Sequence, residues 1–371
     1  MFDLADFYSG GTPLVTKKEY YDGSIPFIRS AEINSKETKL SLSDSGLKNS
    51  SAKMVSKGDI LYALYGATSG EVGISKIDGA INQAILAIKL NDLYSSLFVF
   101  NWLEKSKENI VRKYLQGGQG NLSSSIIKNL NIKIPDDISE QNKIGSLIGS
   151  IDEIIELHQR KINILLKIKR NYLEQLYPKY ENLFLKLRFQ DYNAEWEQRE
   201  FGELVQRVSK TSENINLPTV EYEDISSGQG VLNKKVCLNE NKKKGIEFRE
   251  YDILFGKLRP YLNKWLIPDF KGIAVGDFWV LRPHLLESRF IFYLIQTTKF
   301  QMISNISTGT RMPRSDWNIV SATRFFTPQN NQESKKIGEL IYYLDNMLTL
   351  HQQKINEIIK LKRVYLHKLF L

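Results

Sequence analysis

A segment of 37 residues occurs twice in this chain of 371 residues, and the duplication constrains the fold more than any other feature. Residues 140–176 and 333–369 align without a gap at an offset of 193 positions, and 19 of the 37 positions are identical. Each copy follows a longer segment of divergent sequence. The order variable, constant, variable, constant predicts two different globular heads held by one repeated frame.

Both copies have the pattern of a coiled-coil helix, because their apolar residues alternate by steps of four and three. Each helix would be about 55 Å long at 1.5 Å per residue, and its apolar stripe needs a partner. Antiparallel pairing of the two copies is favoured over parallel pairing and over dimerisation between chains. The predicted seam residues are Ile148, Ile155, His158, Ile162, Leu165, Ile341, Leu348, His351, Ile355 and Ile358.

The start of each helix carries a capping-box pattern, Asp137-x-x-Glu140 in the first copy and Asn330-x-x-Glu333 in the second. His158 and His351 occupy equivalent seam positions. Two interpretations stay open: a polar seam residue that fixes register, and a His–His contact that repels below about pH 6.5.

The divergent segments share little sequence but one skeleton, typical of a mixed α/β domain of about 130 residues. Its parts recur in order: a buried strand, a second apolar run, a helix, a Gly/Ser/Thr-rich loop and a strand that reaches a proline turn. The buried strand is residues 58–62 in the first segment and 251–255 in the second, and the second apolar run is residues 80–90 and 273–281. The helix is residues 95–115 and 288–306, the loop is residues 117–121 and 307–311, and the last strands precede Pro135 and Pro328.

Charge and loop composition favour a nucleic-acid partner. The net charge is +9 and the pI is about 9.2, which suits a polyanion. Arg and Lys can read guanine, Gln and Asn can read adenine, and Lys and Tyr position phosphates; the alternative for each residue is a solvated surface group. The DNA-binding candidates are Arg29, Tyr62, Tyr65, Gln83, Gln119, Asn121, Lys257, Arg259, Tyr261, Lys264, Arg311 and Arg314.

Several function classes lack their sequence signatures. There is no nucleophile elbow, no phosphate loop, no Asn/Asp-Pro-Pro-aromatic tetrad and no His–carboxylate spacing suited to a metal. No catalytic residue and no metal ligand is therefore predicted. The one cysteine, Cys237, excludes an internal disulfide and is expected to be a buried or half-buried thiol in a reducing compartment. No apolar run or leader pattern indicates a membrane, so a cytoplasmic location is expected.

The ordered set of motifs resembles the specificity (S) subunit of type I restriction–modification systems over essentially the whole chain. The resemblance rests in the first half on Ser9–Pro13, on Gly58–Tyr62, and on Pro135 with Glu140, Gln141 and Ile144. It rests further on the duplicated helix, with Leu157-His158-Gln159 and Lys169-Arg170-x-Tyr172-Leu173, and on Trp196 before Phe201-Gly202-Glu203. The first half opens at Leu4–Phe7 without an equivalent of Trp196, so the N-terminus is expected to be a few residues short.

The resemblance implies a fold class of α/β (α+β): two globular mixed α/β target recognition domains separated by two long conserved helices that form an antiparallel coiled coil, a pseudo-twofold tandem repeat. The expected domains are target recognition domain 1 (1–136), helical spacer 1 (137–178), a linker (179–199), target recognition domain 2 (200–329) and helical spacer 2 (330–371).

The resemblance also implies a function without catalysis in this chain. Each recognition domain would read one half of a bipartite asymmetric target in double-stranded DNA, and the helices would dock two methyltransferase (M) subunits that methylate adenine N6. Restriction (R) subunits would join the complex. S-adenosylmethionine, Mg and ATP would be bound by these partners, and no cofactor is expected in this chain. One alternative is a stand-alone DNA-binding or regulatory adaptor, and another is a purely structural coiled-coil adaptor. Binding to DNA that weakens steeply with salt would exclude only the structural adaptor.

Overall fold

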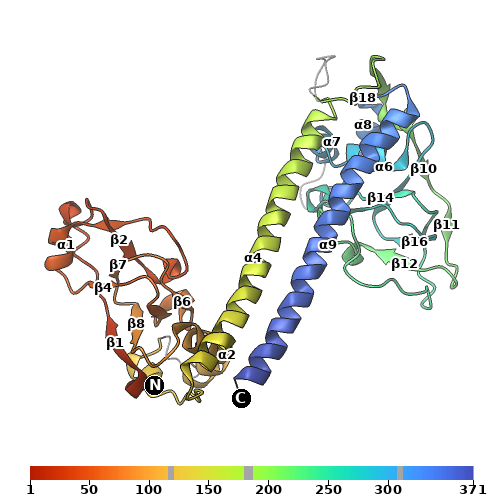
Figure 1. Ribbon diagram of the computed structural model, residues 1–371. Coiled ribbons are helices and arrows are strands. Elements are labelled where there is room, and N and C mark those ends of the chain that lie inside the picture. The colour runs from red at the N-terminus through yellow and green to blue at the C-terminus, as the bar shows by residue number, and fades with distance from the viewer. Residues whose placement is uncertain (116–120, 179–186, 307–311, 371) are drawn as a thin grey trace. The chain divides into compact units, whose positions relative to one another are not determined.

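The computed structural model describes residues 1–115, 121–178, 187–306 and 312–370. Its residues divide into two units, each of which contains one divergent segment and parts of both repeated helices. Unit 1 comprises Met1–His158 and Lys354–Leu371, and unit 2 comprises Gln159–Gln353 (Figure 1).

The strands described in unit 1 form two four-stranded sheets. One sheet is antiparallel throughout, and the other contains a parallel pair formed by its second and third strands. The antiparallel sheet has the order β1 (Ala5–Ser9), β8 (Ile85–Leu90), β5 (Ile60–Ala63), β6 (Val72–Ile74). The mixed sheet has the order β3 (Ser41–Leu42), β2 (Ile25–Ile28), β7 (Gly79–Ile81), β4 (Lys53–Val55).

Strand β5 is buried on both faces, which explains its continuous apolar sequence. Ile60 and Tyr62 pack into the cluster that contains the helices, whereas Leu61 and Ala63 pack into a cluster on the other face. The helical side of unit 1 is formed by α2 (Ser96–Tyr114), α3 (Ser124–Lys128), the first part of α4 (Ile138–Gln175) and the last part of α9 (Asn331–Leu369). The remaining short elements are α1 (Asp44–Lys48), η1 (Phe2–Leu4), η2 (Lys18–Tyr20), η3 (Ser30–Glu32) and η4 (Gly66–Thr68).

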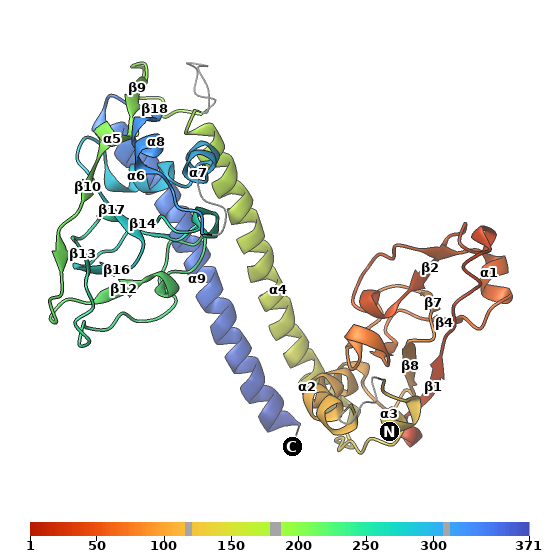
Figure 2. The same ribbon diagram turned by 180° about the vertical axis from the view of Figure 1, so that it is seen from behind.

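The antiparallel sheet of unit 2 repeats the strand order of unit 1. The mixed sheet of unit 2 shares three strands with that of unit 1, but the fourth strand is added at the opposite edge, so that the parallel pair lies at the edge of the sheet. In unit 2 the antiparallel sheet is β10 (Val205–Val208), β17 (Phe278–Pro283), β14 (Ile253–Gly256), β15 (Trp265–Leu266), and the mixed sheet is β11 (Thr211–Ser212), β13 (Gly245–Phe248), β16 (Gly272–Val275), β12 (Thr219–Glu221). β12 and β16 are parallel, as are β2 and β7 (Figure 2). A further strand pair, β9 (Glu197–Glu200) with β18 (Arg324–Thr327), has no counterpart among the described residues of unit 1. The helical elements are α5 (Phe201–Leu204), α6 (Ser288–Leu294), α7 (Thr298–Ser304), α8 (Trp317–Ala322), η5 (Tyr222–Asp224) and η6 (Pro260–Leu262).

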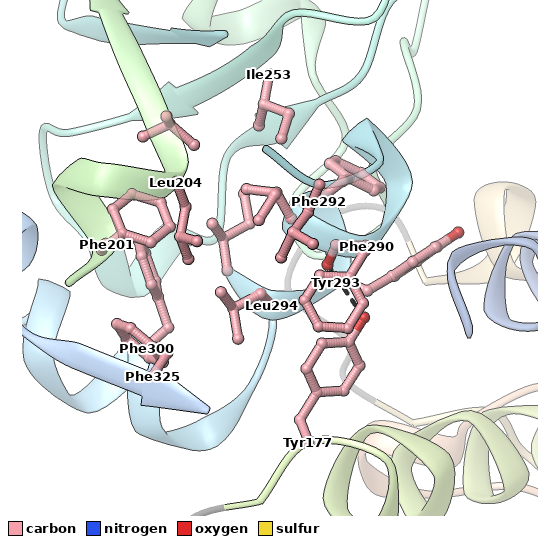
Figure 3. Close-up of a cluster of buried hydrophobic side chains, with 14 of the residues drawn as sticks. Tyr177, Phe201, Leu204, Ile253, Phe290, Phe292, Tyr293, Leu294, Phe300 and Phe325 are labelled. Atoms are coloured by element: carbon pink, nitrogen blue, oxygen red, sulfur yellow. Dashed lines mark hydrogen bonds between the residues drawn. The ribbon is translucent and has the colours of Figure 1, made fainter. Parts of the chain in front are cut away.

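The core of unit 2 is rich in aromatic rings that meet edge to face (Figure 3). The Phe201 ring lies 5.0 Å from that of Phe300 and 5.9 Å from that of Phe325, both in edge contacts. The hydroxyl of Tyr177, which follows α4, donates to the carbonyl of Phe290 at 3.0 Å. Aromatic pairs of this geometry add about 0.5–1.5 kcal/mol beyond their buried area. This core fixes the end of α4 to the helices that cover the unit 2 sheet.

The repeated helices run antiparallel within each unit. In unit 2 the last turns of α4 pack with the first turns of α9, around Leu176, Ile337 and Ile341. In unit 1 the first turns of α4 pack with the last turns of α9, around Ile148 and Phe370. Of the predicted seam residues, Ile148, Ile162, Leu165, Ile341 and Ile355 are buried, and Ile155, His158, Leu348, His351 and Ile358 are half-buried.

Several expectations need correction. The capping boxes form only in part: Asn330 caps α9 by accepting from the N–H of Gln332 at 2.8 Å, but Glu333 turns to Arg188 and Trp196 instead. The expected helix over 288–306 is broken into α6 and α7, and each second apolar run is two strands. Cys237 is exposed, not buried, because it lies in the loop that joins β12 to β13.

His158 belongs to unit 1 and His351 to unit 2, so the repulsive His–His contact stays a prediction. In the part of the chain that the structure describes, none of the helices combines the length and the apolar character that crossing a bilayer requires.

Candidate nucleic-acid interface

Three loops meet in each unit through matching backbone hydrogen bonds. In unit 1 the N–H of Leu64 donates to the carbonyl of Ala84 at 2.8 Å, and the N–H of Leu122 donates to the carbonyl of Leu64 at 2.9 Å. In unit 2 the N–H of Lys257 donates to Asp277 at 2.9 Å, and the N–H of Ser315 donates to Lys257 at 2.9 Å. Each partner in unit 2 lies 193 positions after its partner in unit 1.

We name these sites junction 1 and junction 2. Junction 1 comprises residues 64–71, 82–84 and 121–123, and junction 2 comprises residues 257–264, 276–277 and 312–316. Each consists of a hairpin tip, a turn between two strands and the loop before a short helix. Loops on a rigid scaffold are the usual carriers of recognition, and here the same backbone arrangement carries two different sets of side chains.

Junction 2 is a cluster of charge. The carboxylate of Asp277 lies between two cations: Arg314 Nη2 is 3.0 Å from Oδ2, and Lys257 Nζ is 3.6 Å from Oδ1. The hydrogen bond from Arg314, together with the charges of both cations, holds the pKa of Asp277 below its usual value, although burial opposes the shift. Because one carboxylate faces two cations, this group keeps a net positive charge at neutral pH.

The tip of the junction 2 hairpin has an unusual backbone. Arg259 and Asn263 stand in the left-handed region, with φ of 47° and 53°. Tyr261 in the same tip and Met312 in the adjoining loop are about half exposed, 55% and 50%. The tip therefore presents a cation, an aromatic ring and a thioether on one set of joined loops.

Junction 1 is uncharged at the corresponding positions. Leu64 and Leu122 are buried where unit 2 has Lys257 and Ser315, and Ala84 stands where unit 2 has Asp277. Asn121, which is exposed, stands where unit 2 has Arg314. The contrast is between amide and apolar side chains in one unit and cations in the other.

A pocket lies next to junction 1. Its volume is about 430 Å³, and it is lined by Thr12, Val15, Lys18, Tyr21, Phe27, Arg29, Leu40 and Asn82. The hydroxyl of Thr12 donates to Oε1 of the exposed Gln83 at 2.5 Å, which joins the pocket to the turn of junction 1. Arg29 forms a two-pronged ion pair with Glu32, with Nε and Nη2 each 3.1 Å from a carboxylate oxygen. Although burial opposes it, this pairing lowers the pKa of Glu32.

The prediction that Tyr62 contacts DNA is wrong. Tyr62 is fully buried in β5, and its hydroxyl has no hydrogen-bond partner among the described residues. Burial, helped by the charge of Glu71, raises the pKa of that hydroxyl. Both faces of β5 are covered, so a tyrosine in this strand cannot reach the surface.

Lys264 is engaged inside unit 2. Its ammonium donates to the carbonyl of Ile225 and lies 5.9 Å over the Tyr222 ring, so it ties two loops together. Gln119 and Arg311 lie outside the described residues. The other candidates are exposed or half-buried and stay predictions: Arg29, Tyr65, Gln83, Asn121, Lys257, Arg259, Tyr261 and Arg314.

Sequence reasoning missed three residues of these sites. Asp277 orients two cations, Thr12 holds Gln83, and Asn82 lines the pocket. The repeat offset was the available signal for Asp277, because its equivalent Ala84 follows directly after Gln83. Thr12 lies far from Gln83 in sequence, and no local pattern indicates their contact.

Comparison with known proteins places the chain among DNA-recognition proteins. The family described as the type I restriction modification DNA specificity domain matches residues 1–167 and again residues 193–360. The type I restriction enzyme MjaVIII specificity subunit of Methanocaldococcus jannaschii is 22% identical over 390 residues, covering 97% of this chain and 88% of that protein. The MjaIX specificity subunit of the same organism is 23% identical over 399 residues, covering 99% and 90%.

Solved structures share the fold. The S subunit of a type I restriction–modification system from M. genitalium superposes with a TM-score of 0.68 at 16% identity, covering all of this chain and 94% of that one. A chain from a structural study of complex assembly and conformational transition in the type I system gives a TM-score of 0.52 at 14% identity, covering 99% and 97%.

Proposed function

Because this chain belongs to the family of type I restriction–modification DNA specificity domains, we propose that its two units each read one half of a bipartite, asymmetric DNA target. It is a specificity subunit for DNA sequence recognition and not itself an enzyme. The observation that carries the proposal is the pair of junctions, which share backbone hydrogen bonds at a constant offset but differ in side chains. Two such sites suit two half-sites of different sequence.

The chemistry of the junctions supports half-sites of different composition. Junction 2 offers arginine and lysine, which pair with the O6 and N7 acceptors of guanine or with phosphates. Junction 1 offers amides in Gln83 and Asn121, which pair with adenine. The asymmetry of the target would follow directly from the divergence of the two segments.

The outer faces of the helices support docking of two methyltransferase (M) subunits. Ile154 and Leu157 in unit 1 are 44% and 57% exposed, and their equivalents Met347 and Leu350 in unit 2 are 47% and 63% exposed. Exposed apolar clusters of this kind mark interaction surfaces. Because the same positions are exposed in both units, each unit would bind one copy of the same partner.

The partners would supply the chemistry. The M subunits would bind S-adenosylmethionine and methylate adenine N6 after extrusion of the base, and restriction (R) subunits would use ATP and Mg. This chain would hold none of these cofactors, and it would work in the cytoplasm where its DNA and partners lie. The exposed apolar pairs favour this reading over a stand-alone DNA-binding or regulatory adaptor, which would have no use for them.

The test is single-molecule sequencing of methylated DNA from cells that co-express this chain with its type I methyltransferase. The expected result is a split motif with methyladenine in both halves. A variant with Leu157→Glu and Leu350→Glu should abolish methylation while DNA binding by the isolated chain survives. A stable complex that binds DNA sequence-specifically but leaves every adenine unmethylated would favour the adaptor.

A further inference from the structure

Resting on the proposed function, we propose that Arg259 reads a guanine in the half-site of unit 2, whereas its equivalent in unit 1, Gly66, leaves the corresponding base uncontacted. Both residues lie at the tips of equivalent hairpins, β14–β15 and β5–β6, 193 positions apart. The proposal concerns one residue and one base pair, so it can be tested separately from the general function.

The backbone at this position favours glycine. Gly66 has a φ of +76° and Arg259 a φ of +47°, and a residue with a Cβ rarely adopts such values. Unit 1 therefore carries the residue that the turn prefers, and unit 2 carries one that it resists. Strained residues of this kind cluster at functional sites, where the surrounding structure holds them in place.

The surroundings of Arg259 do hold it in place. Its N–H donates to the carbonyl of Pro313 at 2.7 Å, and its carbonyl accepts from the N–H of Leu262 at 2.8 Å. The next residue is the buried Pro260, whose ring fixes its own φ. The point from which the arginine side chain departs is therefore fixed on both sides, which lowers the entropy lost when the side chain binds.

The side chain itself is exposed and lies in a cationic setting. Lys257 and Arg314 share the carboxylate of Asp277, which is 3.6 Å and 3.0 Å from them. These two cations are partly neutralised within the protein, whereas the guanidinium of Arg259 forms no ion pair with the residues that the structure describes. Arg259 is thus the guanidinium of junction 2 that remains available for a ligand.

Guanine fits this arrangement better than phosphate. A phosphate binds an arginine fork as well, but a lysine on ordinary backbone serves it as a point charge, so a phosphate contact does not require a strained and fixed arginine. A guanine contact needs a planar fork presented at a defined angle to O6 and N7. A strained residue locked on both sides supplies the defined angle.

Strain alone does not mark the site, and the chain contains suitable controls. Tyr251 also has a positive φ, 63°, where unit 1 has Gly58, but it lies before the start of β14, at the opposite end from Arg259. Lys242 is an exposed cation with a φ of 50° in the loop between β12 and β13. Lys242→Gly therefore matches Arg259→Gly in two respects: each removes one positive charge, and each relieves the strain of a positive φ.

The experiment compares Arg259→Gly, Arg259→Lys and Lys242→Gly in the full chain with its methyltransferase. Three quantities are measured for each variant: the thermal midpoint of unfolding, the methylated motif, and the affinity for a set of DNA duplexes that differ at each target position. Both glycine variants should be at least as stable as the parent. Arg259→Gly should lose discrimination for guanine at one position by roughly 5- to 150-fold, as expected for loss of one two-pronged contact. Arg259→Lys should lose most of that discrimination, while its DNA binding keeps the salt dependence of the parent. Lys242→Gly should keep the methylated motif of the parent.

The contrary outcomes are distinct. If Arg259→Gly weakens binding equally to all sequences and reduces the salt slope, Arg259 contacts phosphate and the proposal is wrong. If its motif is unchanged, Arg259 contacts no base and the proposal is again wrong, while the proposed function stands. If the parent chain gives no split motif, the proposed function itself fails.

Discussion

Lys169 Nζ lies 2.7 Å from Asp345 Oδ1, and this ion pair joins α4 to α9 in unit 2. The residues 193 positions away form the same ion pair in unit 1, where Lys362 Nζ lies 2.7 Å from Asp152 Oδ1. One repeated sequence element thus makes the same interhelical contact twice, with lysine and aspartate exchanged between the helices. This exchange is the relation that an antiparallel pairing of two copies requires.

The two ion pairs should differ in strength. Asp345 is 19% exposed and also accepts from the Tyr293 hydroxyl at 2.9 Å, whereas Asp152 and Glu104, the two carboxylates that Lys362 contacts, are each 40% exposed and can rehydrate. We expect Lys169→Met to lower the free energy of unfolding by about 1–3 kcal/mol and Lys362→Met by less. Lys354→Met, which removes an exposed lysine, is the control. Urea denaturation measures all three, and a larger loss for Lys362→Met would contradict the argument.

The Lys362 pair should respond to alkaline pH. Burial opposes its ionisation, but hydrogen bonds from Lys362 to Asp152 and Glu104, with their charges, raise the pKa of Lys362 above 10.5. The contribution to stability is therefore fully present below pH about 10.4, the pKa of an unfolded lysine. It is lost as pH rises through the higher folded value. The difference in unfolding free energy between the parent and Lys362→Met should therefore stay constant up to pH about 10.4 and shrink only above it. A difference that shrinks between pH 7 and 9 would refute the assignment.

Glu333 should be critical for unit 2. Its carboxylate is almost fully buried and accepts from Arg188 at 2.8 Å and 3.0 Å and from the Trp196 indole at 3.2 Å. Glu333→Ala leaves the Trp196 indole and Arg188 Nε without their acceptor, while Arg188 Nη2 keeps its bond to the carbonyl of Ala194, and it should lower the free energy of unfolding by about 3 kcal/mol. Glu140→Ala, the equivalent change in the first copy, removes an exposed side chain and should change it by under about 0.5 kcal/mol. Equal losses, measured by tryptophan fluorescence during denaturation, would show that Glu333 is not specially placed.

The helices and central strands were predictable because their signals are local and repeated. The steps of four and three place Ile148 and Ile341 at the seam, and both are buried. The break between α6 and α7 was less visible: Thr297 caps α7 by accepting from the Phe300 N–H, where the continuous helix α2 has Glu104, a good helix former.

The candidate interface was less predictable, because it depends on contacts between distant segments. Tyr62 has the composition of a DNA contact but lies in a strand that is buried on both faces. Conversely, Asp277 gains its role only when backbone hydrogen bonds bring it to Lys257 and Arg314. Periodicity reports which face of an element is buried; it does not report which loops meet.

Shortening both helices should change the spacer and not the half-sites. Deleting residues 156–162 and 349–355 removes one heptad from each helix, preserves the seam and keeps the two ion pairs between α4 and α9. Seven residues correspond to about 10 Å of helix, or about three base pairs. Methylation sequencing should show a shorter unspecified spacer between unchanged half-sites. A change in either half-site would refute the division between reading and spacing.

The most direct test of the central claim is to exchange one recognition segment and map the methylated motif. Residues 200–328 would be replaced by the equivalent segment of another specificity subunit, with both repeated helices retained. The account predicts that one half of the motif becomes that of the donor, while the other half and the spacer length stay as they were. A motif changed in both halves, or unchanged in both, would contradict the claim that each unit reads its own half-site.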